Sequence, residues 1–356
     1  MWCRSWPSAA LMEAKWLWGC LNGVLLPAAG FPVVSQPSLS SETTAPDASG
    51  ARLLPPVQML AGLGLAVAGV VAFSLRPVII KLAYRYNVDP VTLIMLRMVF
   101  ALPFFLGMAL WPGVRRGAGT GAHAPVAGRD LALTVALGVT GYYAASFCDF
   151  LGLRYVSAGM GRLLLFLYPT IVVVLSALFL GKRIGLREVV ALVVSYAGVA
   201  LVVWSEIGTG HPDFMTGASL VFMGAFLYSI YLVGSSRVVQ RIGSMRFTAY
   251  AMTAACLCCI LQFLALRPLS ALDLPLPVYG LSAVMAVVCT VLPVLMTAEA
   301  LRRVGPNLVA LSGAIGPVAA AVFGYLVLAE PMGWLQLAGA GLTVAGVMII
   351  SLWKTA

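Results

Sequence analysis

The chain has 356 residues, of which 61% are hydrophobic and only 10% are charged, and its net charge is +10. A soluble domain carries about 25% charged residues, so this composition excludes a soluble globular protein. Apolar runs of roughly 18 residues or more recur, which is the length of a membrane-spanning helix. The class that fits is an all-α polytopic membrane protein. Most basic residues lie in short segments between apolar runs. Basic loops are expected on the cytoplasmic side of a membrane protein, so we predict no nucleic acid partner.

The first 56 residues differ in composition from the rest of the chain. Their apolar segment "WLWGCLNGVLLPAAGFPVV" is interrupted by Asn22, Pro27, Gly30 and Pro32, and the polar stretch "SQPSLSSETTAPDASG" follows it. The polar stretch is typical of a flexible linker. We expect 1–56 to be a disordered or dispensable N-terminal extension. The alternatives for its apolar part are an interfacial helix, a poor signal-like segment, and translated sequence upstream of the true start.

Ten apolar segments suited to spanning a membrane follow the extension. They are separated by breaker-rich segments such as "NVDP", "WPGVRRGAG", "TGHPDF" and "LRRVGPN". The first half of the chain, 57–205, is expected to contain spans at 58–82, 91–111, 131–153, 160–180 and 186–204. The second half, 206–356, is expected to contain spans at 215–234, 247–266, 278–298, 308–328 and 334–352.

The charges between the spans predict an orientation. With the N-terminus in the cytoplasm, the inside loops hold Arg115, Arg116, Arg129, Lys182, Arg183, Arg187, Arg237, Arg241, Arg246, Arg302, Arg303 and the C-terminal Lys354. The outside loops hold only three basic residues, Arg85, Arg154 and Arg267, and they carry the acidic residues Asp89, Glu206, Asp213, Asp273 and Glu330. Because basic loops stay on the cytoplasmic side, we expect both termini to be cytoplasmic.

The two halves resemble each other in sequence. A shift of about 148 positions aligns "LRYVSAGMGRLLLFLYPTIVVVLSALFLGKRIG" with "LRRVGPNLVALSGAIGPVAAAVFGYLVLAEPMG" without gaps, and places Arg154 on Arg302 and Pro169 on Pro317. At a slightly different shift, "GVVAFS" (69–74) resembles "GAFLYS" (224–229). Five spans per half is an odd number, so the second half must be inverted. Inverted repeats are typical of secondary transporters, with the substrate site near the bilayer midplane.

An ordered set of short motifs carries a resemblance to a known family. A helix that ends in Lys is followed by "LR" in the next helix and then by "GLRYVSAG…YP…FLG…G…AGV". The segment from Gln58 to Leu352 resembles the EamA-type drug/metabolite transporter superfamily. That resemblance implies ten helices in two inverted halves and export of small organic solutes, often amino acids, across the inner membrane. The positions that match the family's pattern are Lys81, Arg97, Pro169, Pro317 and Glu330.

The first half departs from the pattern where Lys182 stands at a position that is frequently glutamate. The equivalent turn of the second half contains Glu330 and Pro331. We interpret this change of charge as a marker of topology, because it keeps the basic turn inside and the acidic turn outside.

Ionisable residues within the spans are candidate site residues, because each costs several kcal/mol unless it is paired or faces water. Arg76 precedes Pro77 and either faces the cavity, where it would bind an anionic substrate group, or extends toward the outer interface. Arg97, Asp149 and Arg162 are expected in the outer half of the bundle. We expect an ion pair between Asp149 and Arg162, with direct contact to cargo as the alternative.

Glu299 is different, because it lies beside Arg302 and Arg303 at a span end. We expect a salt bridge there, with proton coupling as the alternative.

Hydroxyl groups within the spans complete the candidate site. A mostly apolar pocket with a few polar anchors suits a small organic solute, and the candidates are Tyr142, Ser146, Tyr228, Ser229 and Tyr231. The segment "CLCC" (256–259) lacks a neighbouring histidine, so we interpret its cysteines as packing residues and predict no metal and no cofactor.

The predicted function is secondary transport of a small-molecule solute by alternating access within the lipid bilayer. The chain has no Walker-type phosphate-binding loop, and exchange with a counter-solute, facilitated flow and proton coupling remain open. The alternative is a membrane-embedded enzyme that acts on a lipid or lipid phosphate, which would need clustered carboxylates or an activated nucleophile. The sequence indicates no oligomeric state.

Overall fold

Helix is the only regular structure in the part of the chain that the computed structural model describes, residues 56–111, 126–180, 185–207, 213–330 and 333–352. All of these belong to one unit, Pro55–Ala356. Apart from Pro56, the predicted N-terminal extension lies outside the described residues. So do Arg115, Arg116, the Lys182-Arg183 turn and Lys354.

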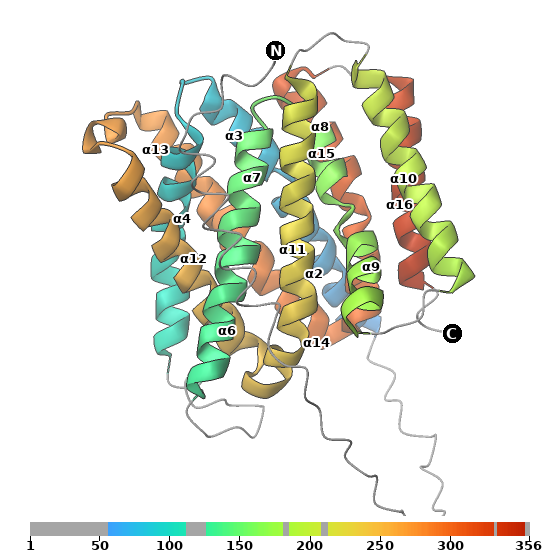
Figure 1. Ribbon diagram of the computed structural model, residues 1–356, viewed down its shortest axis with the longest axis horizontal. Coiled ribbons are helices and arrows are strands. Elements are labelled where there is room, and N and C mark those ends of the chain that lie inside the picture. The colour runs from blue at the N-terminus through green and yellow to red at the C-terminus, as the bar shows by residue number, and fades with distance from the viewer. Residues whose placement is uncertain (1–55, 112–125, 181–184, 208–212, 331–332, 353–356) are drawn as a thin grey trace, which may run out of the picture. The chain divides into compact units, whose positions relative to one another are not determined.

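The helices of the first half lie between 56 and 207 (Figure 1). In chain order they are α2 (Pro56–Ser74), α3 (Arg76–Tyr84), α4 (Pro90–Leu110), α6 (Gly128–Gly138), the π-helical η1 (Val139–Ala144), α7 (Ala145–Gly152), α8 (Ala158–Leu165), α9 (Tyr168–Leu180) and α10 (Leu186–Ile207).

The helices of the second half lie between 214 and 352. They are α11 (Phe214–Ile242), α12 (Ser244–Leu266), the 3₁₀ turn η2 (Leu269–Leu272), α13 (Leu276–Ala286), the π-helical η3 (Val287–Val291), α14 (Leu292–Gly313), α15 (Ile315–Leu328) and α16 (Trp334–Leu352).

Seven helical segments among the described residues are long and apolar enough to cross a bilayer, which makes the chain a multi-pass membrane protein. They are Met59–Tyr84, Pro90–Leu110, Gly128–Gly152, Ala158–Phe179, Phe214–Ile242, Ser244–Leu266 and Leu276–Thr297. Three predicted spans instead overlap shorter apolar helices, Glu188–Trp204, Ile315–Leu328 and Trp334–Ile349.

Two boundaries differ from the sequence prediction. The span predicted at 215–234 continues to Ile242 in α11. The segment "LRRVGPN", predicted to separate two spans, lies inside the continuous helix α14. Packing explains the second difference, because α14 lies along α2 and tertiary contacts outweigh local helix-breaking tendency.

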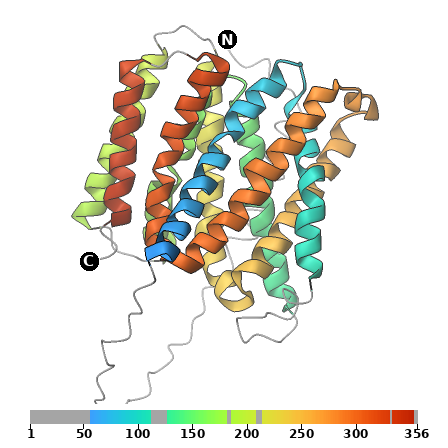
Figure 2. The same ribbon diagram turned by 180° about the vertical axis from the view of Figure 1, so that it is seen from behind.

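Helices α10 and α16 pack against each other through a crossing of small residues. A methyl group at Gly198 would lie 2.5 Å from Thr343 Oγ1, and one at Gly346 would lie 2.3 Å from Ser195 Oγ. Along α10 the contacting residue numbers decrease from 198 to 195, while on α16 they increase from 343 to 346. The two helices are therefore antiparallel. Figures 1 and 2 show this pair at one flank of the helical unit and α4 with α12 at the opposite flank.

The pairs α2–α14 and α7–α11 are also in close contact. In the first pair a methyl group at Gly62 would lie 2.5 Å from Val304 Cγ1. In the second pair, a methyl group at Gly217 of α11 would lie 3.0 Å from Cγ1 of Val156, which follows α7 in the chain. Small residues therefore set the closest helix approaches, as is common in membranes.

Candidate functional site

A break between α2 and α3 positions the first charged side chain. Ser74 Oγ donates to the Val70 carbonyl at 2.7 Å, and α3 begins at Arg76 with Pro77 in its first turn. Proline lacks an N–H and is tolerated at a helix start. The break turns Arg76 toward α7, where its guanidinium donates to the carboxylate of Asp149.

The predicted ion pair between Asp149 and Arg162 is therefore wrong, because Asp149 pairs with Arg76 instead. Nor does Arg76 extend toward the interface, since it is only 8% exposed. Arg162 lies against other helices. Its guanidinium covers the ring of Phe73 at 4.6 Å from the centroid, and its terminal nitrogen would lie 3.0 Å from a methyl group at Gly316 of α15.

Two aromatic rings join the arginines into one group, here called the arginine cluster (Arg76, Arg97, Asp149, Arg162, Phe73, Phe150). Arg97 of α4 is 3% exposed and covers Phe150 at 5.0 Å from the ring centroid. Arg76 lies over both Phe73 and Phe150, at 5.0 and 6.0 Å. The arrangement therefore alternates guanidinium groups and rings.

The charges of the arginine cluster do not balance. Three guanidinium groups surround one carboxylate, and the Nε atoms of Arg97 and Arg162 are buried without a hydrogen-bond partner. A charged side chain at the centre of a bilayer costs about 2.5–3.5 kcal/mol. Contact with an aromatic face returns roughly 0.5–2 kcal/mol. The excess positive charge can attract an anionic group.

Tyrosines form a second group, here called the tyrosine cluster (Tyr142, Tyr168, Tyr228, Tyr231, Phe247). The hydroxyls of Tyr142 and Tyr231 share a hydrogen bond of 2.9 Å. Tyr228 stacks on Tyr231 and meets Tyr168 edge-on, with centroids 5.6 and 5.3 Å apart. The ring centroids of Phe247 and Tyr231 lie 5.8 Å apart. The structure thus brings together the three predicted tyrosines.

The π-helical turn η1 allows this approach. Tyr142 lies in η1, and a methyl group at the neighbouring Gly141 would lie 2.3 Å from Tyr231 Cβ. Only glycine can occupy that position at this distance. π-helical turns occur frequently at functional sites.

The two predicted serines have different surroundings. Ser229 is fully buried, and its hydroxyl lies 2.7 Å from the Ala225 carbonyl and 3.2 Å from the Tyr168 carbonyl. It therefore joins α11 to the start of α9. Ser146 is buried on α7 one turn before Asp149.

Sequence reasoning missed four aromatic members of the two clusters. Phe73 lies three residues before Arg76, and Phe150 directly follows Asp149. Their closeness in sequence to charges within the spans could have identified them. Tyr168 precedes Pro169 at the point where α8 gives way to α9. Phe247 had no distinguishing signal.

Three helix ends meet at Glu330. Its carboxylate accepts from Lys81 Nζ at 2.9 Å and from the Ala158 backbone N–H at 2.9 Å. Ala329 adopts a left-handed conformation, with φ of 54°, which directs Glu330 toward the start of α8. Glu330 is therefore more than a marker of topology, since it joins the ends of α3, α8 and α15.

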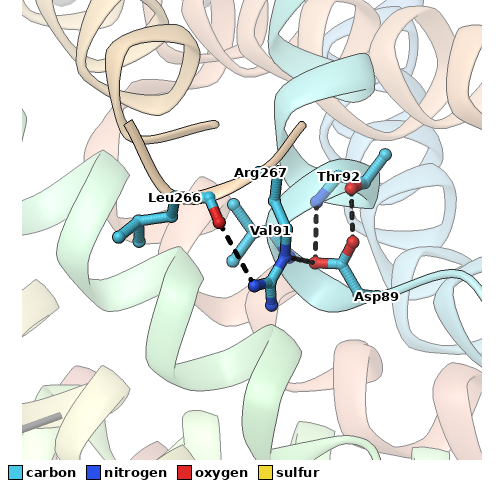
Figure 3. Close-up of polar contacts among 5 residues, drawn as sticks. All are labelled: Asp89, Val91, Thr92, Leu266 and Arg267. Atoms are coloured by element: carbon cyan, nitrogen blue, oxygen red, sulfur yellow. Dashed lines mark hydrogen bonds and ion pairs between the residues drawn. The ribbon is translucent and has the colours of Figure 1, made fainter. Parts of the chain in front are cut away.

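A third ion pair connects the start of α4 to the end of α12 (Figure 3). Asp89 accepts from the Val91 and Thr92 backbone N–H groups at 2.9 and 3.2 Å, from the Thr92 hydroxyl, and from Arg267 Nε at 3.2 Å. Burial by itself raises the pKa of Asp89, but the hydrogen bonds from Thr92 and Arg267 outweigh it, so the pKa lies below its usual value.

Two ion pairs join residues that are predicted to lie on the cytoplasmic side. Glu299 pairs with Arg303 at 2.7 Å, which confirms the predicted salt bridge. Arg241 pairs with Asp130 at 2.9 Å. The cysteines of "CLCC" contribute Cys256 and Cys259 to the hydrophobic core.

Comparisons with known proteins agree with one another. The sequence model of the EamA-like transporter family matches residues 60–204 and again 215–352. The chain is 30% identical to the uncharacterized transporter YcbK of Bacillus subtilis (strain 168), over 79% of this chain and 89% of that protein. It is also 30% identical to a probable terminal-alkyne amino-acid exporter of Streptantibioticus cattleyicolor, over 63% of this chain and 74% of the relative.

A solved crystal structure shares the fold. It covers 84% of this chain and 98% of its own, with a TM-score of 0.54 and 19% identity. The relatives are named as transporters, which sets aside the membrane-embedded enzyme. The chain thus belongs to the EamA-like transporter family, of the drug/metabolite transporter type.

Proposed function

We propose that this protein is a secondary transporter that exports small organic metabolites, such as amino acids or related solutes, by alternating access. In this proposal ten spans form two inverted five-helix halves, 57–205 and 206–356. The protein lies in the inner membrane, both termini are cytoplasmic, and the solute binds between the halves. The substrate-binding residues proposed are Arg76, Arg97, Tyr142, Ser146, Asp149, Arg162, Tyr228, Ser229 and Tyr231.

Repeated irregularities support the two-half architecture. The π-helical turns η1 and η3 begin at Val139 and Val287, which are related by the same shift that aligns the two halves in sequence. Helix breaks at Phe166-Leu167 and at Ala314 are related in the same way. Interrupted helices near the midplane are where transporters of this type bind their solutes.

The helix contacts support inversion. Position 195 of α10 corresponds to position 343 of α16, and 198 to 346, so the contacts Gly198–Thr343 and Gly346–Ser195 are equivalent. Such an exchange of roles is the signature of an internal two-fold axis. Because the two helices are antiparallel, the axis favours halves of opposite orientation.

The ion pairs support the alternation of the spans. Lys81–Glu330 and Asp89–Arg267 each contain an acidic residue that the loop charges assign to the outside. Asp130–Arg241 and Glu299–Arg303 each join residues assigned to the inside.

The arginine cluster is the observation that carries the proposal. A core that needs only to pack would not retain buried Nε atoms of Arg97 and Arg162 without partners, because an unpaired polar group costs stability. Intramembrane charges of this kind mark solute pathways. The name of the Streptantibioticus relative supports export of amino acids or related solutes.

Purified protein in liposomes tests the proposal. We expect flux of radiolabelled amino acids or related metabolites, measured with and without a pH gradient and with and without solute on the far side. The four conditions separate proton coupling, exchange and facilitated flow. Absence of flux for every solute under every gradient would contradict the proposal.

Two variants connect the flux to the site. Arg97→Ala and Arg162→Ala should each reduce transport by about tenfold or more, because each removes a charge-assisted contact. Membrane insertion should be unchanged. Arg237→Ala is the matched control, because Arg237 is exposed on α11. Normal transport by both site variants would remove these residues from the proposed site.

A further inference from the structure

The arginine cluster has a definite charge count. Arg76 and Asp149 form one ion pair, so they neutralise each other. Arg97 and Arg162 have no ion-pair partner among the described residues. The polar contact of Arg97 is a long one to Met98 Sδ, at 3.9 Å. The cluster as a whole therefore carries two positive charges in excess.

The two excess charges contact different aromatic rings of the cluster. Arg162 covers Phe73 and Arg97 covers Phe150, while Arg76 contacts both rings. One ring therefore separates each outer guanidinium from Arg76. A single small anion, such as phosphate, would engage one outer arginine and leave the other unpaired.

We propose that Arg97 and Arg162 bind the two acidic groups of a small organic dianion, and that the solute class is a dicarboxylate. One carboxylate meets each outer guanidinium, and the carbon chain between them passes the Arg76–Asp149 pair. This inference rests on the proposed transport function and narrows its solute class. Planar guanidinium groups pair with carboxylates through two parallel hydrogen bonds, and the free Nε atoms supply the donors.

The Arg76–Asp149 pair has a separate role in this proposal. It holds Phe73 and Phe150 at a fixed spacing, because Arg76 contacts both rings. The spacing then selects the length of the solute. Dicarboxylates of increasing chain length should show one optimum rather than a steady gain with added carbon.

Ligand-dependent thermal stability of the full-length protein in detergent tests this inference. The probes are malonate, succinate, glutarate and adipate, with succinamide as the uncharged analogue and inorganic phosphate as the single-group anion. A ligand that binds the folded state raises the unfolding temperature. We expect the largest rise with one or two dicarboxylates, a smaller rise with phosphate, which can pair with only one of the two arginines, and none with succinamide. Equal effects of succinate and succinamide would overturn the proposal.

Charge-removing variants locate the binding. Arg97→Met and Arg162→Met should each weaken dicarboxylate binding tenfold or more. Arg97→Lys keeps the charge but loses the planar fork of the guanidinium, so its affinity should lie between those of Arg97→Met and the native protein. Arg237→Met, an exposed position on α11, should bind as the native protein does. Without ligand, Arg97→Met should be as stable as the native protein or more stable, because it removes an unpaired buried charge. Native-like binding by both methionine variants would overturn the proposal.

Flux through liposomes separates this inference from the transport function. If amino acids without net charge cross and dicarboxylates neither cross nor compete, transport stands and the dianion site is wrong. If dicarboxylates bind and no solute crosses, the site stands and transport is wrong. The competition experiment needs only native protein, so it decides the question even if a variant does not fold.

Discussion

The first helices of the two halves begin alike and then diverge. Ser74 of α2 and Ser229 of α11 occupy matching positions in "GVVAFS" and "GAFLYS", and each hydroxyl donates to the carbonyl four residues earlier at 2.7 Å. Beyond this serine α2 breaks at Leu75, whereas α11 continues to Ile242. Pro77 accounts for the difference, because it cannot donate within a continuous helix.

The same comparison extends to the charges. At the positions that match Arg76, Asp149 and Arg162, the second half carries Tyr231, Thr297 and Ala310. The scaffold repeats, but at these three positions the charged side chains lie in the first half. The structure therefore suggests how a duplicated fold acquires chemistry: one half supplies the charges and the other supplies apolar and aromatic walls.

Removing Asp149 should have the largest effect, because it would leave three guanidinium groups without a carboxylate. We expect Asp149→Asn to lose about 3–5 kcal/mol of stability, the usual result of breaking a buried ion pair from one side. The measurement is the thermal midpoint in detergent. Thr297→Val, the matching change in the second half, should be nearly neutral. The double variant Arg76→Gln with Asp149→Asn should recover most of the loss, and no recovery would contradict this account.

The glycines between α10 and α16 test how equal the two halves are. A methyl group at Gly198 would lie 2.6 Å from Thr343 N, and one at Gly346 would lie 2.7 Å from Ser195 N. Because backbone atoms cannot easily move, we expect Gly198→Ala and Gly346→Ala to lose similar amounts of stability, about 1–3 kcal/mol each. Gly341 of α16 has open space around it, so Gly341→Ala is the control. A large inequality between the first two would argue against equivalent contacts.

Glu330 has a smaller effect, because it lies at the ends of the spans rather than within them. Glu330→Gln keeps an acceptor for the Ala158 N–H but loses the charge that faces Lys81. We expect a loss of about 0.5–1.5 kcal/mol, the usual net contribution of one hydrogen bond. Lys81→Met should cause a similar loss of stability. A double-mutant cycle should show that the two losses are not additive. Additive losses would mean that the pair contributes nothing as a pair.

Hydropathy and loop charge predicted most helix positions, because the bilayer requires long apolar helices. The predicted span 334–352 coincides with α16. The continuity of α14 could not be read from "LRRVGPN", since it depends on packing against α2. The partner of Asp149 also escaped prediction. It depends on the break at Leu75, which determines the neighbour that Arg76 reaches, and a single sequence does not specify which helices are adjacent.

The ion pair of Asp89 with Arg267 should give the smallest effect and a defined pH dependence. Because the pKa of Asp89 is lower in the folded protein, its carboxylate stabilises the fold above the unfolded pKa, about 3.9. That contribution is lost as the pH falls through the lower folded-state value. Asparagine is an equally good helix cap, so Asp89→Asn should cost only about 0.2–1 kcal/mol at neutral pH. The difference in thermal midpoint should be constant between about pH 8 and pH 5 and shrink below about pH 4. A difference that grows on acidification would show that Asp89 is not stabilised as the carboxylate.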